Sequence, residues 1–260
     1  FEMTLENKDL DLELLKYDRM KHLLNSINET RQPDFILLQE CDSYEQQRLR
    51  DNQFIQKNYF ICSTYSNNNN SNEIMNDLII LSKYKPKAFY QFKLNKIKSN
   101  KMALIAKFEF RGDSLSRIYE ILIVNIHLTS NMSNNSEKKR DEQLNTLHEY
   151  LIKNANDHNL KCDYLFIGGD FNVSDESEEE NRLINELFLK DGFVDLAPKV
   201  NTFDPLNNFS ASITSNDPEK SKRYDRVLMK CFNNTKKLEC LSRSLFNTAP
   251  FEIAYNSSIT

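Results

Sequence analysis

The residues with the clearest chemical potential are polar side chains placed where short apolar runs end. Glu40, His127 and Asp170 each close such a run, and Asn172 follows two positions after Asp170. A glutamate offers the hard oxygen ligand that Mg²⁺ prefers, and this ion takes one or two protein carboxylates while keeping waters for a substrate phosphate. Histidine and asparagine can donate hydrogen bonds to an anion. Together these residue types predict metal-assisted chemistry on a phosphate group.

Each of these residues also has a plain structural interpretation. Glu40 alone fits a solvated strand end, and a single histidine such as His127 is often a hydrogen-bonded core residue. The segment Gly-Gly-Asp-Phe-Asn at 168–172 is the most specific signal in the chain. Two glycines allow a close backbone turn at a strand end, with Asp170 and Asn172 pointing the same way. This segment favours the functional interpretation.

Apolar periodicity predicts the elements that position these side chains. Leucine, isoleucine and methionine recur at helical spacing through about the first thirty residues, until Pro33 ends the pattern. Continuous apolar runs predict strands, and the run 35–38 is typical of a strand buried on both faces. We expect strands at 35–38, 77–82, 102–110, 121–128, 164–170 and 224–229, helices at 137–155 and 181–190, and surface loops at 67–70 and 174–180.

Four motifs, in this order, resemble the endonuclease/exonuclease/phosphatase family. They are Leu38-Gln39-Glu40, Asn125-Ile126-His127-Leu128, Gly169-Asp170-Phe171-Asn172 and Arg223-Tyr224-Asp225-Arg226-Val227. Four ordered motifs over nearly the whole chain rarely arise by chance. The resemblance implies an α/β (α+β) fold, a four-layered sandwich of two mixed β-sheets flanked by helices, with the catalytic residues at one edge of the sandwich.

The resemblance also implies a role for each matched residue. Glu40 is expected to bind the metal ion, Mg²⁺ or alternatively Mn²⁺. Asp170 is expected to orient or deprotonate the attacking water, and Asn172 to donate a hydrogen bond to the phosphate. His127 is expected to stabilise the charged transition state, in which a cation and hydrogen-bond donors offset charge on the phosphoryl oxygens. Asp225 resembles the carboxylate that orients a later catalytic histidine.

Within the family, the pattern is most similar to the tyrosyl-DNA phosphodiesterase branch. The similarity rests on His127-Leu128-Thr129-Ser130, on Arg140 and Gln143, and on Thr202-Phe203-Asp204 ahead of the arginine motif. That branch usually has tryptophan where Phe203 stands and glutamate where Thr129 stands. The resemblance therefore indicates the reaction type more closely than the substrate.

Three further residues are expected to bind substrate. Phe203 could stack on a base or a sugar, since base–aromatic stacking tolerates any sequence, or it could anchor a loop. Arg223 and Arg226 are expected to contact phosphate, because the guanidinium geometry suits that anion. The plain alternative for 220–226 is a solvated basic turn.

Two motifs of the family do not occur in the 260 residues. Family members open with a strand that ends in an asparagine beside the metal ligand. They close with a Ser-Asp-His segment that supplies the catalytic histidine. We therefore expect 1–260 to be a single endonuclease/exonuclease/phosphatase domain truncated at both ends. Function is predicted for the parent protein, and an inactive or poorly folded fragment is one expected outcome.

Composition narrows the class of protein. The chain has 39% hydrophobic and 28% charged residues with a net charge of −4, which fits a folded protein and not one held to nucleic acid by bulk charge. No apolar run approaches the ~20 residues that cross a bilayer, and the amino terminus does not resemble a signal peptide. The five cysteines show no paired spacing, which favours reduced thiols and an intracellular location, cytoplasmic or nuclear.

These observations predict a monomeric Mg²⁺-dependent phosphodiesterase that acts at nucleic-acid ends, as a 5′-tyrosyl-DNA phosphodiesterase does in DNA repair. One alternative is an RNA 3′-exonuclease or deadenylase. Another is a phosphatase or sphingomyelinase acting on small phosphodiesters. A third, from a different class, is a non-catalytic binding domain on the same fold. The intact Glu40, His127, Asp170 and Asn172 argue against this last alternative.

Overall fold

The structure, a computed structural model, describes residues 20–29, 32–63, 78–95, 101–111, 118–154, 160–207 and 219–232. The chain divides into two compact units, one of 1–34 with 245–260 and the other of 35–244. Residues 20–29 are helical, as the first predicted helix requires. The start of that helix and the predicted loop at 67–70 lie outside the described residues. The expectation of a single domain over 1–260 stays a prediction.

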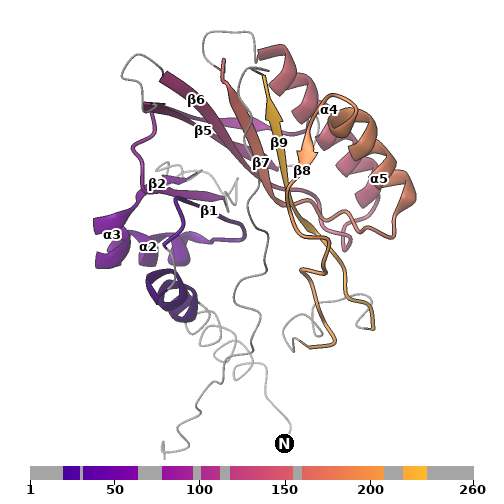
Figure 1. Ribbon diagram of the computed structural model, residues 1–260. Coiled ribbons are helices and arrows are strands. Elements are labelled where there is room, and N and C mark those ends of the chain that lie inside the picture. Colours follow the sequence, from indigo (N-terminus) through magenta and orange to yellow (C-terminus); the bar gives the residue numbers. More distant parts are fainter. Residues whose placement is uncertain are drawn as a thin grey trace, which may run out of the picture. The chain divides into compact units, whose positions relative to one another are not determined.

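Two β-sheets form the centre of the unit 35–244 (Figure 1). The smaller sheet has the order β1-β3-β2 and the larger has the order β4-β5-β6-β7-β9-β8. The strands are β1 Phe35–Leu38, β2 Phe60–Ser63, β3 Ile79–Ser82, β4 Ala88–Lys93, β5 Met102–Arg111, β6 Ile118–His127, β7 Tyr164–Asp170, β8 Val194–Asp195 and β9 Asp225–Cys231. The larger sheet is mixed, since β6 and β7 run parallel whereas β4–β5, β5–β6, β7–β9 and β8–β9 run antiparallel. The described pairs of the smaller sheet are antiparallel.

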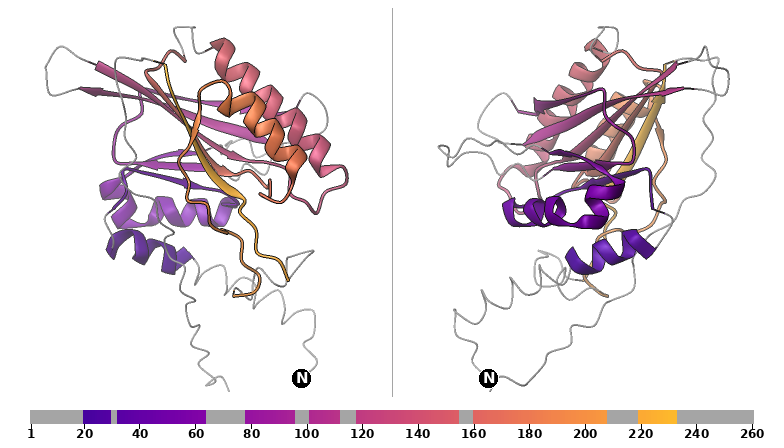
Figure 2. Two further views of the ribbon diagram at one scale, coloured as in Figure 1. Left: turned by 45° about the vertical axis from the view of Figure 1, so that its right-hand side comes forward. Right: turned by 90° about the vertical axis from the view of Figure 1, so that its left-hand side faces the viewer.

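Helices cover the outer faces of both sheets (Figures 1 and 2). They are α2 Ser43–Asp51, α3 Gln53–Asn58, α4 Ser136–Asn154 and α5 Glu178–Ile184, the last continued by a wider π-helical turn, Asn185–Leu189. α2 and α3 lie against the smaller sheet, and α4 and α5 against the larger one. The four-layered sandwich of two sheets flanked by helices is confirmed.

Alternating side chains explain why the layers pack. On β5, Leu104 and Ala106 belong to the hydrophobic cluster between the two sheets. Ala103 and Ile105 belong to the cluster that includes the buried leucines of α4. Successive side chains of a strand point to opposite faces, so one apolar strand can supply both clusters. The same alternation on β6 points Asn125 toward the smaller sheet, on the same side as Ile123.

Several elements differ from those predicted. β1 and β7 have the predicted bounds, and α4 begins one residue earlier than expected. The prediction that 35–38 is buried on both faces is wrong: all four residues are half-buried, and β1 lies at the edge of the small sheet among the described strands. α5 begins inside the segment 174–180 that was expected to be a loop, with three glutamates in its first turn, where the helix dipole favours negative charge.

α2, α3, β2, β4 and β8 were not predicted. α2 does carry a recognisable start signal, because the Asp42 carboxylate accepts a hydrogen bond from the Glu45 backbone N–H and the Glu45 carboxylate accepts one from the Asp42 backbone N–H. Among the described residues, no helix has the length and hydrophobicity needed to cross a bilayer.

Candidate active site

Strand register brings three of the predicted site residues side by side. β6 and β7 run parallel with His127 opposite Asp170. β9 runs antiparallel to β7 with Asp225 opposite Asp170. The last residues of β6 and β7 and the first of β9 therefore form a row His127, Asp170, Asp225 at one edge of the larger sheet.

Glu40 reaches this row from the smaller sheet. The imidazole Nε2 of His127 lies 3.8 Å from Glu40 Oε1 and 4.0 Å from Asp170 Oδ2. The side chain of Glu40 is 75% exposed, that of Asp170 28%, and that of His127 7%. An exposed carboxylate, a half-buried carboxylate and a buried imidazole thus face one another at the end of the sandwich.

Asn172 lies in the loop after β7 and forms hydrogen bonds at the ends of β6 and β7. Its backbone N–H donates to Asp170 Oδ1 at 2.7 Å, and its Nδ2 donates to the Leu128 carbonyl at 3.1 Å. Its φ of 52° is in the left-handed region, which asparagine adopts more readily than most residues. The amide of Asn172 therefore connects the loop after β7 to the loop after β6, and the backbone of Leu128 donates in turn to the Asp170 carbonyl at 2.9 Å.

A buried amide, Asn125, fixes the turn that carries Glu40. Asn125 is fully buried on β6, and its Nδ2 donates to the carbonyls of Leu38 and Ile79, both at 2.9 Å. Its Oδ1 accepts from Gln39 Nε2 at 2.7 Å. One side chain of the larger sheet therefore binds two strands of the smaller one. Glu40, the residue after Gln39, has φ 58°, a left-handed conformation that is unusual for glutamate. Such strained conformations persist at functional sites when the surrounding contacts hold them.

Two carboxyl groups of the row have raised pKa values. Loss of hydration and the neighbouring charge of Asp225 raise the pKa of Asp170 to about 6, and His127 partly offsets this. Desolvation also raises the pKa of Asp225, whereas the hydroxyl of Thr202 lowers it. Perturbed carboxyl groups cluster at catalytic sites, where a base needs a pKa near the working pH.

The two glycines before Asp170 serve the strand and not a turn, since β7 continues through Asp170. A Cβ on Gly168 would lie 2.6 Å from the Leu37 side chain, and one on Gly169 would lie 2.1 Å from the Ile126 carbonyl oxygen. Gly169 also has φ 134°. The predicted close backbone turn is therefore wrong, and the glycines instead allow β7 to lie close to β1 and β6.

Substitution of Gly169 by alanine is expected to be severely destabilising, by more than about 3 kcal/mol, because the new methyl meets fixed backbone. Gly192 is a matched control with φ 87° and open space around its Cβ position, so Gly192→Ala adds only local strain of about 1 kcal/mol. Urea unfolding of both variants measures the difference. Equal losses of stability in the two variants would show that the close approach of Gly169 to the Ile126 carbonyl does not restrict the residue at this position.

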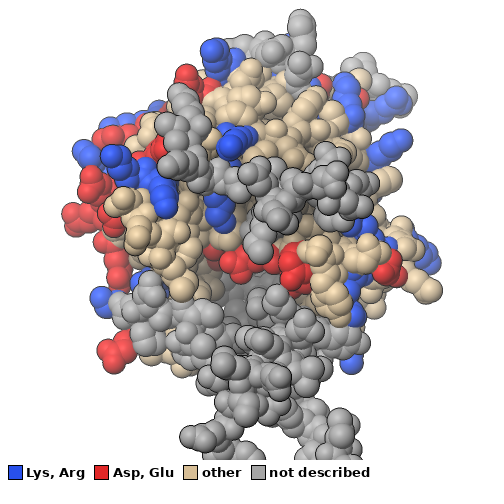
Figure 3. All heavy atoms as spheres, turned by 180° about the vertical axis from the view of Figure 1, so that it is seen from behind, with Lys and Arg blue, Asp and Glu red and all other residues tan. Residues whose placement is uncertain are grey.

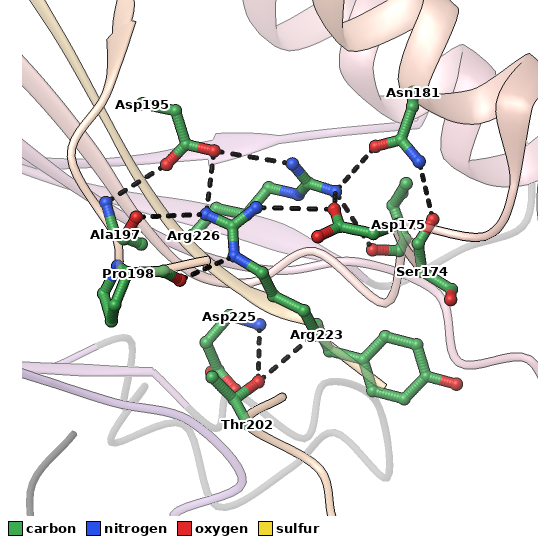
Figure 4. Close-up of polar contacts among 12 residues, drawn as sticks. Ser174, Asp175, Asn181, Asp195, Ala197, Pro198, Thr202, Arg223, Asp225 and Arg226 are labelled. Carbon is green, nitrogen blue, oxygen red and sulfur yellow. Dashed lines mark hydrogen bonds and ion pairs between the residues drawn. The ribbon is translucent and has the colours of Figure 1, made fainter. Parts of the chain in front are cut away.

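The two arginines of the last motif lie inside a polar network (Figure 4). Arg223 donates to Asp195 Oδ2 at 2.8 Å and to the Pro198 carbonyl at 2.9 Å. Arg226 donates to Asp175 Oδ1 and Asn181 Oδ1, both at 2.7 Å. Both side chains are buried. The prediction that they contact phosphate remains untested, and this geometry favours a role in holding the loops around the site.

Phe203 lies beside the site on a loop that pairs with Lys222. Phe203 is half-buried, and its ring centroid lies 5.6 Å from that of Tyr224. Thr202 precedes it, and the Thr202 hydroxyl accepts hydrogen bonds from the backbone N–H groups of Tyr224 and Asp225, both at 3.1 Å (Figure 4). Phe203 remains partly accessible, so stacking on a substrate stays a prediction.

The donor set suits a hard divalent cation held by few protein ligands. Among the described residues, no group of three or more His, Cys, Asp or Glu side chains is arranged to hold a metal ion. Mg²⁺ often takes one or two carboxylates and fills its other positions with water and substrate oxygens. The exposed carboxylate of Glu40, aimed at the row, fits this mode, whereas a closed site of zinc type does not fit.

Surface charge on one face of the molecule is mixed. Figure 3 shows acidic side chains across the middle of one face with lysines and arginines around them. The described part of this face therefore lacks the continuous basic surface that sequence-independent binding of duplex DNA uses. Recognition of a phosphate would depend on local groups at the site.

Sequence patterns missed two residues that shape the site, Asn125 and Thr202. Asn125 was visible as a polar residue inside the apolar run 121–128, on the inward alternation of β6. Thr202 carried no signal beyond its place in a motif, because its partners come from a strand more than twenty residues later.

Comparison with known proteins gives a family match and several similar folds. The family model described as endonuclease/exonuclease/phosphatase family matches residues 13–230. Truncated TDP2 from Caenorhabditis elegans has 18% identity and a TM-score of 0.59, over 82% of this chain and 77% of that chain. TDP2 from D. rerio, complexed with single strand DNA product, has 19% identity and a TM-score of 0.62, over 85% and 80%.

A beta hairpin deletion mutant of beta toxin from Staphylococcus aureus has 20% identity and a TM-score of 0.63, over 92% of this chain and 91% of that chain. No curated protein matches the chain in sequence. At these identities the likeness to solved structures shows the fold, and it does not separate TDP2 from the toxin.

Proposed function

The chain belongs to the endonuclease/exonuclease/phosphatase family, and from this premise we propose that it hydrolyses phosphodiester bonds with Mg²⁺, at nucleic-acid ends. The family match confirms the resemblance that the four motifs predicted. Members of this family are generally dependent on divalent metal ions. The observation that carries the proposal is the approach of the Glu40 and Asp170 carboxylates to the same nitrogen of His127, Nε2, at 3.8 and 4.0 Å.

Each side chain has a defined task in this proposal. Glu40 would hold Mg²⁺, which when bound would supply positive charge beside the substrate phosphate. Asp170 accepts a proton from the attacking water, for which its raised pKa is suited. His127 donates a hydrogen bond from Nε2 to a phosphoryl oxygen, and such donors act most strongly where water is excluded. The buried position of His127 meets that condition.

Asn172 and Asp225 support these groups. The Asn172 amide can share its donors between the Leu128 carbonyl and a phosphate oxygen. Asp225 lies next to Asp170 in the strand register, and we propose that it orients the family's later histidine. Mn²⁺ is proposed as an alternative ion. The monomeric state and the cytoplasmic or nuclear location remain predictions.

A nucleic-acid substrate is favoured by the similar TDP2 structure with a DNA product and by the half-buried Phe203 beside the site. The second candidate is a small phosphodiester, because Glu40, Asp170 and Asn172 match the family's motifs whatever the substrate, and the likeness in fold does not favour TDP2 over the S. aureus beta toxin. Base stacking on Phe203 is available only to the first class of substrate.

A substrate panel separates these candidates. We expect a 5′-phosphotyrosyl oligonucleotide to be cleaved with a higher kcat/KM than poly(A) RNA or sphingomyelin, in this chain or in a form extended at both ends. Phe203→Leu should weaken kcat/KM for the oligonucleotide by about tenfold, the effect of one lost stacking contact. Preference for sphingomyelin, with no effect of Phe203→Leu, would instead support the small-phosphodiester function.

A further inference from the structure

A buried ion pair lies behind the loop that follows His127. Arg140 of α4 is fully buried, and Glu180 of α5 is almost so. Arg140 Nε donates to Glu180 Oε1 at 2.5 Å, and Arg140 Nη2 donates to Glu180 Oε2 at 3.0 Å. This two-point contact fixes the guanidinium plane as a single hydrogen bond could not.

The remaining donors of this network are directed at Thr129. Arg140 Nη1 donates to the Thr129 carbonyl at 2.8 Å. Gln143, one helical turn further along α4, accepts from the Thr129 N–H at 3.0 Å and donates to Thr129 Oγ1 at 2.8 Å. Its second amide hydrogen goes to Asn95 Oδ1 at 2.8 Å. Every backbone polar group of Thr129 is thus held by α4.

Thr129 stands two residues after His127, and the residue between them belongs to the site. Leu128 donates its N–H to the Asp170 carbonyl and accepts a hydrogen bond from Asn172 Nδ2. The peptide from His127 to Thr129 is therefore held on one side by the catalytic loop and on the other by α4. Its position depends on both sets of bonds.

A gain in stability alone does not explain why Arg140 and Glu180 form a buried ion pair. Taking an arginine and a glutamate out of water is costly, and apolar residues of similar size often stabilise a core as well or better. An apolar pair could not hold the Thr129 carbonyl. We propose that Arg140, held in place by Glu180, is a positioning residue that fixes Thr129 and thereby keeps the His127 imidazole Nε2 near Glu40 and Asp170. The inference rests on the proposed function for its kinetic effect, although not for its effect on the loop.

The test compares ways of removing the pair. Arg140→Met alone leaves Glu180 buried and unpaired, so a lower Tm is expected. The double variant Arg140→Met with Glu180→Leu removes both charges and should recover most of that Tm. In the double variant we expect kcat to remain about a hundredfold below wild type, with KM within about threefold, because a small misplacement of a catalytic group costs this much. Arg140→Lys, which keeps the charge and a donor, should recover part of kcat.

A matched control breaks another buried ion pair, which joins β5 to β6. Lys107 is buried and its Nζ lies 2.8 Å from Glu120 Oε1, at the other end of β6 from His127. Lys107→Met should lower Tm but leave kcat within about twofold of wild type, because it lies far from the chemistry.

Hydrogen exchange gives a readout that needs no activity. In the double variant the Thr129 amide should exchange at least about tenfold faster, whereas the Val124 amide in the middle of β6 should not change. A double variant with wild-type kcat and unchanged exchange at Thr129 would overturn the inference. If the wild-type protein cleaves no phosphodiester, the proposed function fails, and the exchange rate of Thr129 alone decides whether Arg140 positions the loop.

Discussion

Asp170→Asn is expected to lower kcat for phosphodiester hydrolysis by about 10²- to 10⁴-fold, the contribution of a positioned general base. Asparagine has nearly the same shape and can still accept the Asn172 N–H at Oδ1, so the site should keep its geometry. It cannot take a proton from water. The measurement is steady-state hydrolysis of bis-nitrophenyl phosphate with Mg²⁺, comparing the variant with wild type at one pH.

The stability of Asp170→Asn should rise while its activity falls, and this stability measurement is the control for correct folding. The pKa of Asp170 is raised from 3.8 to about 6 in the folded protein, so the folded state holds this proton more tightly than the unfolded state. Stability therefore falls as pH rises from about 4 through about 6, and the loss is complete above that window. At neutral pH, with metal removed, Asp170→Asn should be more stable than wild type by about 2 kcal/mol. A variant that is both inactive and unstable would show only misfolding.

Asn125→Leu is expected to destabilise the protein by about 3–5 kcal/mol. The leucine fills a similar volume but leaves the carbonyls of Leu38 and Ile79 and the amide of Gln39 without this partner. Each buried polar group that loses its partner costs about 1–3 kcal/mol. Urea unfolding measures the loss. Because the turn that carries Glu40 depends on these bonds, we also expect weaker activation by Mg²⁺ in any variant that remains folded.

Asn145→Leu is the matched control for this substitution. Asn145 is exposed on α4, and its side chain donates a hydrogen bond to the Asp141 carbonyl of the same helix. Its replacement should change stability by less than about 0.5 kcal/mol. Similar effects of the two substitutions would contradict the conclusion that Asn125 connects the sheets.

The position of a candidate site residue could be predicted from the sequence when it depends only on the strand that carries the residue. Glu40, His127 and Asp170 end apolar runs, and the structure brings the carboxylates of Glu40 and Asp170 within 4.0 Å of His127 Nε2. The position of Asn172 could also be predicted, because its hydrogen bond to Asp170 joins residues only two positions apart. In each case a short stretch of chain contained the information.

Features that depend on tertiary partners were not predictable in this way. The burial of Arg223 and Arg226 depends on Asp175 and Asp195, which lie far away in the sequence. β1 has an apolar sequence, yet it is half-buried and lies at a sheet edge among the described strands. The glycines of β7 suggested a turn because the packing of Leu37 and Ile126 against them could not be seen in the sequence.

The central claim is tested most directly by hydrolysis of a thymidine 5′-nitrophenyl phosphate with Mg²⁺ and with a chelator. It is measured on this chain and on the form extended at both ends. We expect release of nitrophenol in the extended form, abolished by the chelator and reduced at least about a hundredfold in Glu40→Gln. A folded extended protein that releases no nitrophenol, or does so equally with chelator, would contradict a metal-dependent phosphodiesterase and support a binding domain on the same fold.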